Sequence, residues 1–296
     1  MDSTKDFTTE IRYVHKDPLF KREKPYSADF DPGDGKPQTN HVSSPTAMLI
    51  RHISPHESFD LNVHGFCVLK SSSTVSPEDI LMRPREVEDV CFKEAEALLQ
   101  THFPEYERID AMSLTVRKRD VRFPALQGSP AHLVTHEQPA TRPHCDYSIR
   151  GVATQLQMCF PGQLEFFDGK DYDLLKYVAR ELSSVQQAGS IGPNDDYPLT
   201  LCNHTSIAPD DIFDSDAVHR DRVSENSLLH PNKKHRWHYI AGQMPDDILV
   251  FRNTDSKGTR PRAFHCAVNN PLSKSPLRQS MEIRFVAFRR PEAIVS

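Results

Sequence analysis

The stretch Arg142-Pro143-His144-Cys145-Asp146-Tyr147-Ser148 is the part of this 296-residue sequence around which we expect the fold to be organised. Side chains alternate along an extended segment, so His144 and Asp146 project from one face and Cys145 from the other. An imidazole beside a carboxylate, completed by one distant histidine, is the set of ligands that holds ferrous iron in many non-haem enzymes. The His-x-Asp spacing alone is a weak signal, because the chain contains 15 His and 41 Asp plus Glu.

The second histidine is expected at His265, which lies in an apolar, strand-like context far downstream. A lone histidine in such a strand is more often a hydrogen-bonded core residue than a metal ligand. The balance shifts because of Arg278-Gln279-Ser280, in which the arginine offers a planar fork for a carboxylate and Ser280 adds a hydroxyl from the same face. This pair suits the distal carboxylate of a co-substrate such as 2-oxoglutarate, whose keto acid end would chelate the metal. Cys266, like Cys145, would then turn away from iron into the core.

Composition excludes several classes of function. The formal net charge of −5 gives no reason to expect nucleic acid or an anionic membrane surface as a partner, so we expect a small-molecule substrate. No segment approaches the roughly 18 apolar residues of a membrane span, and the polar start of the chain lacks the apolar core of a signal peptide. The six cysteines form no CxxC pair, which argues against a zinc ribbon or a disulfide framework and favours a reducing, cytoplasmic setting.

The pattern of elements predicts a mainly β fold, a β-sandwich or jelly roll with flanking helices. Residues 1–50 are polar with scattered aromatics, and we expect an extended N-terminal arm that lies over the surface of a single jelly-roll domain, residues 51–296. Apolar residues at three- and four-residue spacing after Pro84 predict a helix that ends near Pro104. Strands are expected at 59–69, 109–121, 199–202, 235–240, 247–251, 263–268 and 281–288, an acidic loop at 207–216, and either a helix or a strand at 151–160.

Six pieces of the sequence, taken in order, carry a resemblance to a known family. They are His144-Cys145-Asp146, Tyr197-Pro198-Leu199-Thr200-Leu201-Cys202, His235-Arg236-Trp237-His238-Tyr239, Asp255-Ser256, His265 and Arg278-Gln279-Ser280-Met281-Glu282-Ile283-Arg284. Over residues 60–290 the chain resembles fungal and bacterial non-haem iron(II)/2-oxoglutarate oxygenases, which include hydroxylases and desaturases of the aspergillic-acid, gibberellin and cephamycin pathways. The resemblance implies a double-stranded β-helix, iron held by His144, Asp146 and His265, and 2-oxoglutarate held by Arg278 and Ser280.

The implied activity is that of an iron(II)- and 2-oxoglutarate-dependent dioxygenase. It would use molecular oxygen to oxidise an unactivated C–H bond of a small secondary metabolite, by hydroxylation, desaturation or cyclisation, while the keto acid is decarboxylated to succinate. Two alternatives stay open: an iron oxidase with the same three ligands but no keto acid, and a non-catalytic jelly-roll binding protein with buried histidines. The N-terminal arm is long enough to cross to a second subunit in a homodimer.

One segment departs from the family pattern. Family members carry a Trp-Arg-Pro strand before the Pro-Leu-x-Leu-Cys segment, and the nearest match here is Val178-Ala179-Arg180-Glu181-Leu182. If this match holds, residues 173–183 form a strand, Arg180 faces the pocket as a further cofactor-binding residue, and Ala179 opens space beside the substrate. The apolar spacing instead favours a surface helix, and the sequence leaves the two interpretations even.

Four other residues have two interpretations each. Arg284 is the alternative to Arg278 for the co-substrate carboxylate, although an ion pair with a neighbour is the stronger expectation. For Trp237, a position in the wall of the substrate pocket and a position in the core are equally expected. Arg142 and Arg252 are candidates to meet an acidic group of the substrate, but solvated surface is the stronger expectation for both.

Overall fold

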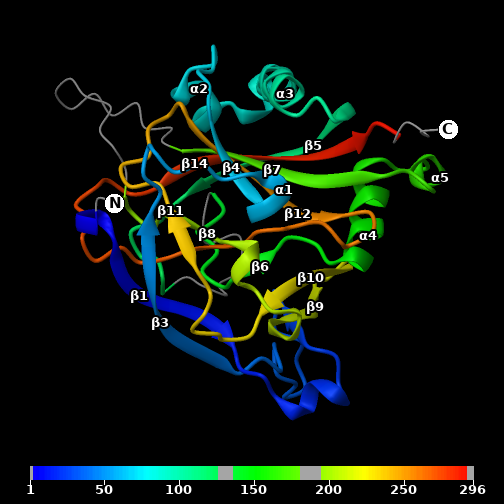
Figure 1. Ribbon diagram of the computed structural model, residues 1–296. Coiled ribbons are helices and arrows are strands. Elements are labelled where there is room, and N and C mark those ends of the chain that lie inside the picture. The colour runs from blue at the N-terminus through cyan, green and yellow to red at the C-terminus, as the bar shows by residue number, and fades with distance from the viewer. Residues whose placement is uncertain (1–2, 126–135, 181–194, 292–296) are drawn as a thin grey trace.

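The computed structural model describes residues 3–125, 136–180 and 195–291. Two curved sheets face each other in these residues, with helices packed outside them (Figure 1). The larger sheet has the order β1-β3-β11-β8-β13-β6-β10-β9-β2, and the smaller has the order β4-β12-β7-β14-β5. This architecture confirms the predicted mainly β jelly roll with flanking helices.

The strands are β1 Phe7–Val14, β2 Tyr26–Ala28, β3 Ser43–His52, β4 Phe66–Lys70, β5 Tyr106–Lys118, β6 His144–Cys145, β7 Tyr172–Arg180, β8 Leu199–Cys202, β9 Ile212–Val218, β10 Val223–Leu229, β11 Trp237–Tyr239, β12 Asp247–Asp255, β13 Phe264–Ala267 and β14 Gln279–Arg289. The helices are α1 Leu61–His64, α2 Pro77–Met82, α3 Pro84–His102, α4 Ile149–Cys159 and α5 Leu164–Phe167. Short 3-10 helices lie at Ser3–Lys5, Pro18–Lys21, His204–Ser206 and Pro209–Asp211. No helix among the described residues is long and apolar enough to cross a membrane.

The helix predicted after Pro84 is confirmed as α3. Its buried residues Cys91, Ala95 and Leu99 follow the predicted spacing and pack against the outer face of the smaller sheet. Figure 1 shows α2 and α3 on that face, away from the larger sheet. Burying such a stripe stabilises an amphipathic helix far more than its intrinsic propensity does. The helix therefore supports the sheet from outside and leaves the space between the sheets to other side chains.

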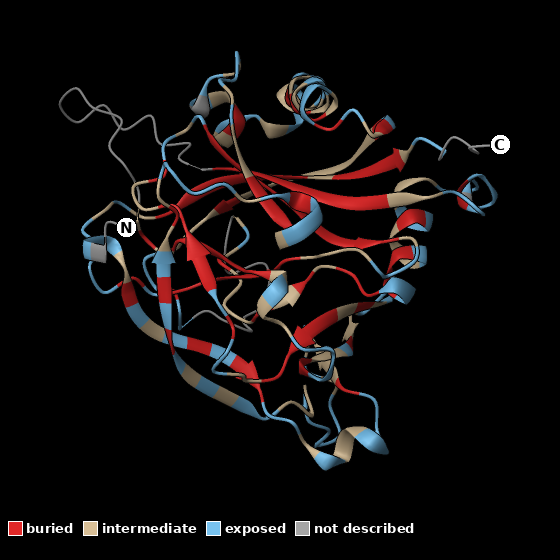
Figure 2. Cartoon of the chain, in the orientation of Figure 1, coloured by how far each residue is buried: buried red, intermediate tan, exposed pale blue. Residues whose placement is uncertain are grey.

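The N-terminal segment corrects the expectation of an arm. β1 pairs antiparallel with β3, and β3 runs parallel to β11, so both strands belong to the larger sheet and a boundary at residue 50 falls inside β3. Figure 2 shows buried and exposed residues alternating along them. The buried side chains include Tyr13, whose hydroxyl accepts a hydrogen bond of 2.8 Å from Trp237 Nε1. Trp237 is fully buried there, which settles its place in the core.

Residues 172–180 form the strand β7 and not a surface helix. β7 lies between β12 and β14, with Leu175 and Ala179 in the cluster beneath α3 and Val178 in the core between the sheets. A strand buried on both faces reads as an almost continuous apolar run, so periodicity cannot separate it from a buried helix. Ala179 therefore opens no space beside a substrate. The side chain of Arg180 and residues 181–194 lie outside the described residues.

Three further segments refine the predicted elements. The expected strand at 59–69 begins as α1, which ends at Gly65 with a φ of 83°, and only then becomes β4. The ambiguous segment 151–160 is the helix α4, capped by Ser148. The expected acidic loop at 207–216 is wrong in its second half, which is β9. Its carboxylates are paired across strands, because Asp214 accepts from Ser227 at 2.6 Å and Asp216 pairs with Lys24.

Candidate active site

Two neighbouring strands bring the predicted metal ligands together. β6 and β13 pair antiparallel with His144 opposite His265, and Asp146 follows directly after β6. The Asp146 backbone N–H donates to Asn253 Oδ1 of β12 at 3.0 Å, which fixes the turn. Each histidine Nε2 lies 3.3 Å from Asp146 Oδ1, and the three candidate ligand atoms lie within 4.8 Å of one another.

Both histidines direct Nε2 toward the position between the three candidate ligand atoms. His144 Nδ1 donates to the carbonyl of Arg142 at 2.8 Å, which leaves Nε2 with a free lone pair. Burial and the nearby His144 and Lys176 lower the pKa of His265 to about 3, so its ring is neutral, the form that binds metals. Cys145 and Cys266 are fully buried in the core cluster of the larger sheet, so alternation turns them away from the site as predicted.

The carboxylate between the histidines is held ionised. Burial raises the pKa of Asp146, but the charges of Lys176 and Arg284 hold it well below its usual range. Arg284 Nε donates to Asp146 Oδ2 at 2.7 Å. Arg284 thus makes the expected ion pair with a neighbour, and it is not among the residues that line the inner cavity described next.

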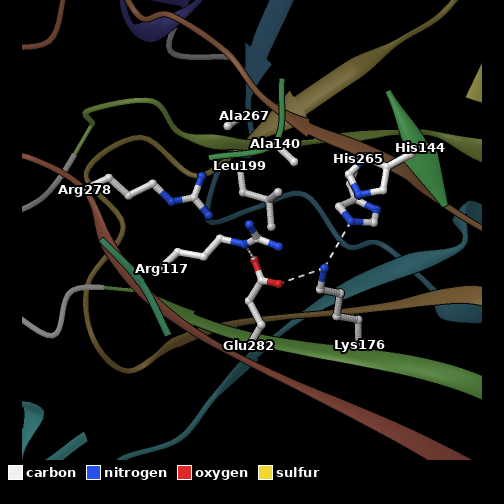
Figure 3. Close-up of a pocket in the computed structure, with 9 residues that line it drawn as sticks. All are labelled: Arg117, Ala140, His144, Lys176, Leu199, His265, Ala267, Arg278 and Glu282. Atoms are coloured by element: carbon white, nitrogen blue, oxygen red, sulfur yellow. Dashed lines mark hydrogen bonds and ion pairs between the residues drawn. The ribbon is translucent and has the colours of Figure 1, made fainter. Parts of the chain in front are cut away.

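An inner cavity extends from the histidines to Arg278 (Figure 3). Arg278 stands just before β14 and is buried, with Nη1 donating to the Tyr197 carbonyl at 2.8 Å and Nε 3.3 Å from Ser280 Oγ. The predicted pair Arg278 and Ser280 is therefore brought together. Figure 3 shows Arg278 at the end of the cavity opposite His144 and His265. The lining consists of Arg117, Ala140, His144, Lys176, Leu199, His265, Ala267, Arg278 and Glu282.

The residues at the head of this cavity fit ferrous iron. Two neutral imidazoles and one ionised carboxylate, all aimed at one point, form the facial donor set that non-haem iron prefers. His265 Nδ1 is buried without a hydrogen-bond partner among the described residues. Among the described residues, His144, Asp146 and His265 are the only group of three or more such side chains that could hold a metal ion.

Comparison with known proteins places the chain in a family. The family model described as "Oxidoreductase/YMDC permease-like domain" matches residues 11–288. The chain belongs to this family. The Fe(II)/2-oxoglutarate-dependent dioxygenase NvfI of Aspergillus novofumigatus is 25% identical over 300 residues, which cover 95% of this chain and 96% of that protein. The gibberellin cluster GA4 desaturase of Gibberella fujikuroi is 31% identical over 78 residues, 24% of this chain and 23% of that protein.

The fold is also similar to a solved structure. The iron and alpha-ketoglutarate-dependent endoperoxidase NvfI superposes with a TM-score of 0.77 and 22% identity, over 97% of this chain and 99% of that chain. The names of these relatives confirm the resemblance to iron(II)/2-oxoglutarate oxygenases that the ordered motifs predicted.

Within this family member, the inner cavity also holds a charge network that the sequence did not reveal. Glu282 accepts from Arg117 Nε at 2.6 Å and forms an ion pair with Lys176 Nζ at 2.9 Å, and Lys176 Nζ lies 3.3 Å from both His265 Nε2 and Asp146 Oδ2. Burial lowers the pKa of Lys176 despite these two carboxylates. A single lysine inside the apolar run Leu174-Leu175-Lys176-Tyr177-Val178 was the signal that could have revealed it.

An outer cavity of about 650 Å³ adjoins the candidate ligand His144. It lies along β2, β9 and β10 and the segment that leads into β6. His144 and Ala140 line both cavities, so the candidate metal site lies where the two cavities meet. The volume is in the range of small-molecule sites.

The two arginines considered for an acidic substrate group differ in their places. Arg142 lines the outer cavity. Arg252 is neither on the surface nor in either cavity, because it is fully buried and its Nη2 lies 3.1 Å from Asp173 Oδ2. Only Arg142 keeps the interpretation of a residue that meets a substrate.

Proposed function

We propose that this protein is an iron(II)- and 2-oxoglutarate-dependent oxygenase that oxidises an unactivated C–H bond of a small secondary metabolite, by hydroxylation, desaturation or cyclisation. The observation that carries the proposal is the convergence of His144, Asp146 and His265, with ligand atoms within 4.8 Å, where the two cavities meet. The relatives named as iron(II)/2-oxoglutarate-dependent oxygenases support it.

The three ligands would hold ferrous iron on one face and leave its other positions open to both cavities. Iron supplies the redox chemistry, in which 2-oxoglutarate and oxygen give succinate and carbon dioxide while the second oxygen atom serves to oxidise the substrate. The protein orients the ligands: the Arg142 carbonyl fixes the His144 ring, and Arg284 and Asn253 fix Asp146. Without these bonds the donor atoms would not converge.

In the inner cavity, Arg278 and Ser280 would bind the distal carboxylate of 2-oxoglutarate. The lining carries three cationic side chains, Arg117, Lys176 and Arg278, and one carboxylate, Glu282, so it offers several donors to an anion. The space between the side chains is about 10 Å³, room for one water molecule, so binding requires Lys176 or Arg278 to shift.

Succinate formation tests this function. With ascorbate present to supply the two electrons that no substrate gives, protein purified anaerobically and loaded with ferrous iron should convert 2-oxoglutarate to succinate on exposure to oxygen, one succinate for each keto acid consumed, and His144→Ala should not. An enzyme that binds iron but forms no succinate, even in the presence of a substrate it turns over, would belong to the alternative class of iron oxidases without a keto acid. Protein that takes up no iron at all would instead be a binding protein on this fold.

Partners and location form a second part of the proposal. The substrate would be a small molecule, with molecular oxygen as the co-substrate. All six cysteines are free thiols, which supports a reducing, cytoplasmic compartment. A homodimer remains a prediction.

Lys176→Met is expected to bind ferrous iron about tenfold more tightly and 2-oxoglutarate more weakly. Two unit charges about 4 Å apart at a partly buried site interact by roughly 4 kcal/mol, and Glu282 offsets only part of the repulsion between Lys176 and a cation at Asp146. Anaerobic titrations with each ligand measure both affinities. The matched control is Lys93→Met, on the exposed face of α3. Weaker iron binding in Lys176→Met would contradict this account of the charges.

A further inference from the structure

Arg142 joins the candidate metal site to the outer cavity. Its carbonyl oxygen accepts the bond from His144 Nδ1 at 2.8 Å, so the backbone of Arg142 is fixed beside the ligands. The residue also lines the outer cavity together with His144. A molecule bound to the Arg142 side chain in that cavity would therefore lie next to the metal position.

The guanidinium of Arg142 is held in place by two other elements. Its Nη1 donates to His41 Nδ1 at 2.9 Å, and the other ring nitrogen of His41, Nε2, lies 2.9 Å from Ser215 Oγ. An arginine can only donate, so His41 carries its hydrogen on Nε2 and donates to the serine. Burial and then the charge of Arg142 lower the pKa of His41 to about 4. The histidine is thus neutral and positions the guanidinium without compensating its charge.

No carboxylate neutralises Arg142 within the described part of the chain. Its guanidinium donates to His41 Nδ1 and forms no ion pair with a carboxylate of that part. Asp29 and Asp216 line the same cavity, but Asp29 pairs with His219 at 2.7 Å and Asp216 pairs with Lys24.

Three other arginines that are buried or nearly so have acidic partners. The N–O distances are 2.6 Å for Arg117 to Glu282, 3.1 Å for Arg252 to Asp173 and 2.7 Å for Arg284 to Asp146. Because a largely buried cation without a counter-charge costs free energy, Arg142 is a preformed site for an anion.

We propose that Arg142 binds a carboxylate of the substrate, so that the enzyme acts on small molecules that carry a carboxylate on an apolar body. A guanidinium pairs with a carboxylate through two parallel hydrogen bonds, which fixes direction as well as position. The cavity offers an apolar wall for the rest of such a molecule at Pro139, Ala217, Val218 and Leu228. The proposal rests on the proposed function for the fate of the bound molecule but not for its binding.

A matched pair of fluorescent probes tests the proposal on the full chain. The probes are 11-(dansylamino)undecanoate and its methyl ester, which differ only in the charged group. We expect the wild-type protein to bind the acid at least about tenfold more tightly than the ester, since a charge-assisted bidentate pair is worth at least about 1.4 kcal/mol. Arg142→Gln should remove that preference and leave the affinity for the ester unchanged, and Arg142→Lys should keep part of it.

Two control variants locate the effect. Arg85→Gln removes the same charge from the exposed surface of α3 and should change nothing. Arg278→Gln removes the other candidate carboxylate-binding residue, so a preference that survives in it shows that the probe is not held in the inner cavity.

Equal binding of acid and ester by the wild-type protein would overturn the proposal, whether or not Arg142→Gln folds. A preference that persists in folded Arg142→Gln would overturn it as well. Iron uptake and succinate formation, measured on the same preparations without the probes, report separately on the oxygenase function. If the acid preference is absent but iron is taken up and succinate forms, only the carboxylate proposal is wrong. If the preference is present but no iron is taken up, only the oxygenase function is wrong.

Discussion

Asp146→Asn is expected to abolish tight binding of ferrous iron. The substitution keeps the shape of the side chain but removes the only carboxylate between the two histidines, and it leaves Glu282 alone to offset the charges of Lys176 and Arg284 beside the metal position. Removing one partner from a buried charge pair costs about 3–5 kcal/mol, and the loss of a metal–carboxylate bond adds to this, so affinity should fall by at least roughly 10²- to 10³-fold.

The measurement is iron per chain after anaerobic loading and removal of free metal. Asp246→Asn is the matched control, because Asp246 is half exposed and pairs with Lys70 on the surface. Retention of iron by Asp146→Asn at the level of this control would mean that the three predicted ligands do not form the metal site.

Arg278→Gln is expected to lose affinity for 2-oxoglutarate and to bind iron like the wild-type protein. Truncating one partner of a buried, hydrogen-bonded charge pair costs about 2–5 kcal/mol, which corresponds to roughly 30- to several-thousand-fold in affinity. Ser280→Ala removes only a neutral donor, worth about 1 kcal/mol, and should weaken binding less than tenfold. Calorimetric titration of the metal-loaded protein with 2-oxoglutarate measures both variants.

Arg117→Gln separates direct binding from a general loss of positive charge. Arg117 lines the same cavity but is already paired with Glu282 at 2.6 Å. If this variant loses more affinity than Arg278→Gln, then Arg117 and not Arg278 holds the distal carboxylate.

The residues that could be predicted from the sequence are those whose meaning depends on short spacing or on order along the chain. His144 and Asp146 share a face because a strand has a period of two, and Arg278 shares a face with Ser280 for the same reason. The structure brings one member of each pair, His144 and Arg278, to opposite ends of one cavity. α3 was predictable because one face is buried and the other is exposed, which is the condition under which periodicity carries information.

The features that sequence reasoning missed depend on contacts between distant segments. β7 reads equally well as a helix because both of its faces are buried, and β1 and β3 read as a polar arm because one face of each is exposed. Lys176 owes its role to Asp146, His265 and Glu282, which come from three other parts of the chain.

The environment of Arg142 was equally out of reach. Its side chain is bonded to His41, which precedes β3, and His41 is bonded to Ser215 in β9. Surface was therefore the reasonable expectation for Arg142 from the sequence, and only the folded chain shows the charge to be fixed within a cavity.

The most direct test of the central claim is an anaerobic absorption titration of the iron-loaded protein with 2-oxoglutarate. A keto acid that chelates ferrous iron gives a visible charge-transfer band, which reports on the metal and the co-substrate together. We predict that the band saturates at one keto acid per chain in the wild-type protein, is absent in Asp146→Asn, and requires far more 2-oxoglutarate in Arg278→Gln. A wild-type protein that holds iron but shows no band at saturating 2-oxoglutarate would contradict the account.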